Sequence, residues 1–144
     1  MKIEVGYLDV AAEKEILHRY TNGNGAQSQY SVLTPVDVLH LQAESRKVHI
    51  DDKIVDYMIE AVNRTRNHPE IDLGISPRGT VALFRASQAL ALVADRNFVV
   101  PDDVKRAIFP VFGHRLILAR NSVKGKKGTT EVLEGILEDL TVPV

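Results

Sequence analysis

Arg78 is the residue of this chain whose type and place most suggest chemistry. It follows Ser76-Pro77, a pair that predicts the N-cap and the first position of a helix. Arg78 would then lie in the first helical turn, where free amides and the helix dipole favour an acid over a cation. A guanidinium beside such amides can bind a phosphate. A surface ion pair with Asp72 would explain it equally well, so both interpretations stay open.

The other phosphate-binding patterns are absent. A nucleotide-binding loop requires G-x-x-x-x-G-K-[ST], but Gly125-Lys126 is followed by Lys127, and Arg120 stands where the first glycine belongs. Gly23 and Gly25 lack the third glycine of a dinucleotide-binding turn. A phosphate-binding fold complete within this chain is therefore not expected.

Metal-dependent and nucleophilic chemistry finds no support either. The histidines form no H-E-x-x-H motif, and the spacing of His40 and Glu44 favours an exposed helix contact over half of a metal site. No G-x-S-x-G is present, and Ser76 is better explained as a helix cap. Without cysteine there is no thiolate, disulfide or Cys-rich metal site. We expect no catalytic residue and no metal site here.

The composition fits one globular domain with an adequate core. The chain has 144 residues, 44% of them hydrophobic, and a formal net charge of -1. So balanced a charge gives no general attraction to nucleic acid or anionic membranes. Neither a signal peptide nor a membrane span is expected, and the lack of cysteine suggests a reducing, cytoplasmic setting.

Periodicity and capping residues predict a mainly α protein, a helical bundle. Helices are expected at 9–20, at 34–46 after the Thr34 N-cap, at 51–67, at 76–94, from 101 onward and at 131–140. The nearly apolar helix 76–94 should lie at the centre. Residues 71–75 are interpreted as a connector. Short strands are predicted at 2–7 and, as a possibility, at 116–118.

The helix from Pro101 should turn four residues inward: Val104, Ala107, Ile108 and Val111. Val100 is a poor N-cap, so Asp102 and Asp103 must compensate. Pro110 predicts a bend near residue 106.

Several short motifs together resemble the C-terminal helical lid of MoxR-type AAA+ ATPases. The matching segments, in chain order, are Ile3 to Tyr7, Tyr57, Thr65-Arg66-Asn67-His68, Gly74-Ile75-Ser76-Pro77-Arg78, Asp95 to Val104, His114-Arg115 and Val142-Pro143. Departures from that pattern are Leu8 for Pro, Ile75 and Gly79 for Ala, and Asp95 for Gly. Gly79 should weaken the helix start by about 0.5–1 kcal/mol relative to Ala.

The resemblance implies that Arg78 is the sensor 2 arginine, which binds the terminal phosphates of ATP in its own or a neighbouring subunit. It also implies that residues 1–8 are the last strand and connector of an upstream ATPase core and that 9–144 are the lid. ATP and Mg²⁺ would serve the full-length protein. Because the Walker motifs are missing, this chain alone should bind neither and should not hydrolyse ATP.

The partners implied are the upstream core, a ring of identical subunits, most simply a hexamer, and client proteins, often ones with a von Willebrand factor A domain. The alternative is a free-standing helical adaptor or DNA-binding module that uses the basic loop 115–127. Its cations would be Arg115, Arg120, Lys124, Lys126 and Lys127, although a solvated loop explains them more simply.

Overall fold

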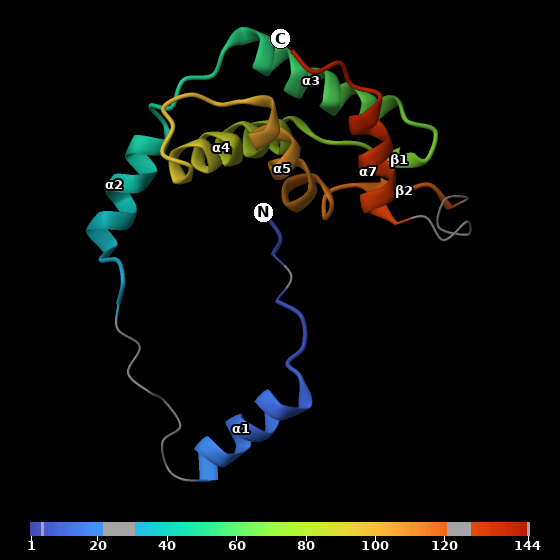
Figure 1. Ribbon diagram of the computed structural model, residues 1–144. Coiled ribbons are helices and arrows are strands. Elements are labelled where there is room, and N and C mark those ends of the chain that lie inside the picture. Colours follow the sequence, from blue (N-terminus) through green and yellow to red (C-terminus); the bar gives the residue numbers. More distant parts are fainter. Residues whose placement is uncertain (4, 22–30, 121–127, 144) are drawn as a thin grey trace.

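The computed structural model describes residues 1–3, 5–21, 31–120 and 128–143. Its helices are α1 (Val10–Thr21), α2 (Pro35–Ser45), α3 (Asp52–Asn67), α4 (Pro77–Val93), α5 (Pro101–Phe112) and α7 (Thr129–Glu138) (Figure 1). Two short strands complete it, β1 (Ile71–Leu73) and β2 (Ile117–Leu118). The mainly helical fold is confirmed.

The core lies where α3, α4, α5 and α7 meet. All four residues predicted to face inward from α5 are buried. They pack with apolar residues of α3 and α7, among them Met58, Val62 and Leu133. Helix α4 contacts α2, α3 and α5, as its central place in the prediction requires, but Val81 and Val93 on its outer side remain exposed.

The two strands pair as an antiparallel ribbon, with Ile71 opposite Leu118 and Leu73 opposite Ile117. The possible strand at 116–118 is therefore confirmed at 117–118. The interpretation of 71–75 as a connector is wrong for its first three residues. Their partner lies more than forty residues further along the chain, so no local turn signal marks the pairing.

The segment before α1 differs from its predicted conformation. Residues 2–7 form no strand in the part that the structure describes, and Ile3 and Val5 are exposed. The backbone N–H of Lys2 donates to the carbonyl of Pro110 at 2.7 Å. A strand needs a neighbouring strand to pair with, and no described residue forms a ladder with this segment.

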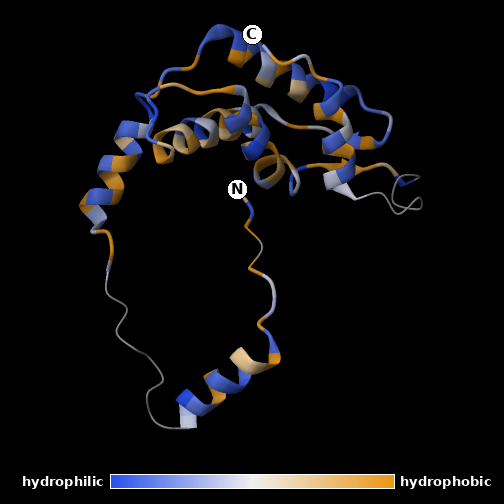
Figure 2. Cartoon of the chain, viewed as in Figure 1, coloured by the Kyte–Doolittle hydropathy of each residue, from blue (hydrophilic) through white to orange (hydrophobic). Residues whose placement is uncertain are grey.

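Helices α1 and α2 contribute no buried residue to the body. Figure 1 shows α1 standing apart from the other helices, and Figure 2 shows hydrophobic residues along both helices. Thr34 caps α2 as predicted, because its hydroxyl accepts from the Asp37 N–H while the Asp37 carboxylate accepts from the Thr34 N–H.

A left-handed residue ends α4. The backbone of Asp95 has a φ of 56°. The Asp95 N–H donates to the Leu92 carbonyl, and the Arg96 N–H donates to the Ala91 carbonyl at 2.9 Å. These two bonds define a Schellman motif, whose left-handed position favours glycine. The geometry explains why glycine suits this position in the resembling family.

An ion pair with a buried carboxylate fixes the start of α5. Both outer nitrogens of the Arg96 guanidinium donate hydrogen bonds to the Asp103 carboxylate, at 2.7 and 2.8 Å. The side chain of Asp103 is only 2% exposed. Asp103 also accepts from the Val100 N–H at 3.0 Å, the compensation that the sequence required. Burial raises the pKa of Asp103, but the hydrogen bonds from Arg96 and Val100 outweigh it, so its pKa lies below the usual value.

Asp95→Gly should raise the free energy of unfolding by about 1 kcal/mol, since glycine adopts the left-handed conformation without the steric cost of a Cβ. The Asp95 side chain hydrogen bonds with no described residue, so its removal loses no such contact. Urea denaturation measures the change. Asp95→Ala is the control and should not stabilise; equal stability of the Gly and Ala variants would contradict the strain argument.

Candidate functional site

Arg78 lies in the first turn of α4 with its side chain exposed. Among the described residues it has no hydrogen-bond or ion-pair partner. The predicted alternative, an ion pair with Asp72, does not form. A free guanidinium at the start of a helix can therefore meet a ligand from outside this chain.

The first turn of α4 differs in charge from those of the other described helices. Each of those carries an acid in its first turn, whereas α4 has none there. Ser76 occupies the N-cap position as predicted, but its hydroxyl makes no cap hydrogen bond. Pro77 has no N–H, and the N–H groups of Gly79 and Thr80 donate to the Ser76 carbonyl at 2.8 and 3.1 Å. Among the described hydrogen bonds, the Arg78 N–H is therefore the amide of this turn without an acceptor.

The segment that leads into this turn rests on the end of α3. Gly74 lies so close to α3 that an added Cβ would meet the Arg66 Cα at 2.7 Å and the Thr65 carbonyl oxygen at 2.8 Å. Any side chain at 74 would therefore push the segment off the helix. Ile75, the next residue, is 1% exposed, so α4 begins from a fixed point.

Ile75 and Gly79 fit one another across the helix start. A Cβ on Gly79 would lie 2.6 Å from the Cγ2 of Ile75, and the Cδ of Arg115 lies 3.6 Å away. The methyl group of Ile75 thus fills the space that an alanine at 79 would occupy. The two departures from the family pattern compensate in volume, a relation that the expectation of a weakened first turn overlooked because it treated Gly79 alone.

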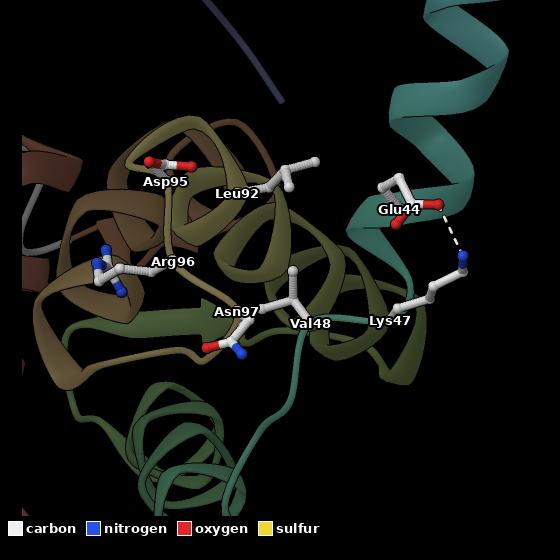
Figure 3. Close-up of a pocket in the computed structure, with 7 residues that line it drawn as sticks. All are labelled: Glu44, Lys47, Val48, Leu92, Asp95, Arg96 and Asn97. Atoms are coloured by element: carbon white, nitrogen blue, oxygen red, sulfur yellow. Dashed lines mark hydrogen bonds and ion pairs between the residues drawn. The ribbon is translucent and has the colours of Figure 1, made fainter.

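A hollow beside α2 does not include Arg78. This pocket of about 280 Å³ is lined by Glu44, Lys47, Val48, Leu92, Asp95, Arg96 and Asn97 (Figure 3). Lys47 pairs with Glu44 at 2.7 Å, and Arg96 is held by Asp103. Leu92 is fourteen residues from Arg78 on one helix, a separation of about 21 Å. The pocket and the candidate site are separate features.

The cations of the basic loop are mostly beyond what the structure describes. Lys124, Lys126 and Lys127 lie outside the described residues, and Arg120 is exposed. Arg115 is engaged, since its guanidinium donates to the carbonyl of Val111. The DNA-binding alternative gains no support from the part of the loop that can be seen.

Within the described ranges, no cluster of three His, Asp or Glu side chains could hold a metal ion. No helix there is long and apolar enough to cross a membrane.

The complementarity of Ile75 and Gly79 predicts a change of sign. Gly79→Ala should lower the free energy of unfolding by about 1–3 kcal/mol, because the buried, β-branched Ile75 cannot move aside cheaply. In an Ile75→Ala background the same change should instead stabilise by about 0.5–1 kcal/mol, the ordinary preference of a helix for alanine. A double-mutant cycle by urea denaturation measures the coupling, and the same sign in both backgrounds would refute it.

Comparison with known proteins gives a consistent result. Residues 63–136 match the family model described as the AAA lid domain. The chain is 32% identical over 143 residues to an uncharacterized protein, YeaC, of Bacillus subtilis (strain 168). The aligned region covers 99% of this chain and 45% of YeaC. The chain is 29% identical over 151 residues to chaperone MoxR1 of Mycobacterium tuberculosis, covering 99% of this chain and 40% of the relative.

A solved structure agrees in shape as well. The crystal structure of a "putative ATPase" from Cytophaga hutchinsonii superposes with a TM-score of 0.85 at 29% identity, covering all of this chain and 46% of that protein. The chain thus spans less than half the length of these relatives. The family model and the solved structure agree that this chain belongs to the AAA lid domain family.

Proposed function

We propose that Arg78 is the sensor 2 arginine of a MoxR-type ATPase and links nucleotide binding to the position of this lid. One observation carries the proposal: Arg78 is an exposed cation, without a partner among the described residues, at the start of a helix whose first turn holds no acid. A bidentate guanidinium in the first turn of a helix suits the terminal phosphates of ATP.

The nucleotide itself would bind mainly to an upstream core. This chain lacks the Walker motifs, so Arg78 would be its contribution to the site. ATP with Mg²⁺ supplies the phosphoryl group that is transferred to water. The guanidinium would neutralise charge that develops on the phosphate oxygens, in its own subunit or in a neighbour.

The lid would serve a chaperone-like machine. The relative named chaperone MoxR1 supports this role. We propose that the full-length protein assembles into a ring, most simply a hexamer, and remodels or activates client proteins, including ones with a von Willebrand factor A domain. The exposed hydrophobic residues of α1 and α2 would suit contacts with the upstream core or with neighbouring subunits.

In the full-length protein, Arg78→Ala should lower the kcat of ATP hydrolysis at least about tenfold, because a charge contact to the reacting phosphate is lost. Arg78 is exposed, so the thermal midpoint should hardly change. The matched control is Arg106→Ala, which removes an exposed arginine on a different helix, α5. This variant should hydrolyse ATP at the normal rate. Unchanged turnover in the Arg78 variant would contradict the sensor assignment.

A further inference from the structure

Both backbone polar groups of Ile75, its N–H and its carbonyl, are hydrogen-bonded to neighbouring residues of α3. Its N–H donates to the Thr65 hydroxyl at 3.1 Å, and its carbonyl accepts from the Arg66 Nε at 2.8 Å. Thr65 is fully buried, and its hydroxyl donates in turn to the Val62 carbonyl at 2.7 Å. The last turn of α3 therefore grips the residue from which α4 departs.

The two halves of this grip differ in burial. Thr65 belongs to the core, so its loss would disturb folding as well as the segment. Arg66 is exposed, and its hydrogen bond to Ile75 spans nine residues of sequence. Water can replace that bond energetically, but water cannot fix the direction in which the carbonyl points. Arg66 thus contributes more to orientation than to stability.

From this geometry we propose that Arg66 is a positioning residue for Arg78, by fixing the Ile75 carbonyl and with it the first turn of α4. The proposal rests on the proposed function of Arg78. Only Ser76 and Pro77 separate Ile75 from Arg78, and Pro77 has a restricted backbone angle. A small rotation at Ile75 therefore passes directly to the guanidinium, and a displacement of about 1 Å can cost about a hundredfold in rate.

The neighbouring Arg64 offers a matched control. It lies on the same last turns of α3 and is of the same residue type, but it pairs with Glu60, at 2.9 Å, and faces Asp139, at 4.0 Å. Among the described contacts none joins Arg64 to residues 74–78. Removing it takes a charge from α3 and leaves the grip on Ile75 intact.

The test measures ATP hydrolysis by the full-length protein in two backgrounds, with Arg78 present and with Arg78→Ala. With Arg78 present, Arg66→Ala should lower kcat on the order of tenfold, Arg66→Lys should restore part of it through a single donor, and Arg64→Ala should change it less than about twofold. In the Arg78→Ala background, Arg66→Ala should cause less than about a twofold further loss. The thermal midpoints of Arg66→Ala and Arg64→Ala should agree within a few degrees.

The outcomes separate the two proposals. If Arg78→Ala lowers turnover but Arg66→Ala has no effect, or has the same effect in both backgrounds, the positioning role is overturned while the sensor assignment stands. A loss that follows a fall in thermal midpoint in both backgrounds overturns it too. If Arg78→Ala leaves turnover unchanged, the sensor assignment fails and the positioning role fails with it.

Discussion

The contact of the Gly74-Ile75 segment with the last turn of α3 is the constraint on which the site depends. Gly74 approaches α3 more closely than any side chain would allow, and the N–H and carbonyl of Ile75 hydrogen-bond to Thr65 and Arg66. Because the Ile75 side chain is also buried, backbone and side chain fix the same residue. The direction of α4, and so the position of Arg78, follows from this contact of Gly74 and Ile75 with α3.

The far end of α4 is fixed by a different set of interactions. Asp95 turns the chain in a Schellman motif, and Arg96 then binds Asp103 at the start of α5. Midway, the buried amide of Gln88 donates to the carbonyl of Val48 at 2.8 Å, which ties α4 to the segment after α2. These contacts hold α4 at both ends and near its middle.

Local signals in the sequence were sufficient for the helices and for the place of Arg78 in the first turn of α4. Thr34, Asp51 and Pro101 mark helix starts by capping chemistry that acts within four residues. Features that join distant residues were not predictable in this way. The pairing of β1 with β2, the bond from Arg66 to Ile75 and the fit of Ile75 with Gly79 each depend on which segments fold against one another. The strand predicted at 2–7 needs a partner that the described residues do not provide, and the absence of an Asp72 ion pair could be learned only from the structure.

The central claim is that the Arg78 guanidinium binds a phosphate group supplied from beyond this chain. A crystal structure of the full-length protein with a non-hydrolysable ATP analogue and Mg²⁺ tests it most directly. The account predicts guanidinium nitrogens within about 3 Å of the terminal phosphate oxygens, in the same subunit or a neighbouring one. A guanidinium paired instead with a carboxylate, and distant from every nucleotide in the assembly, would contradict it.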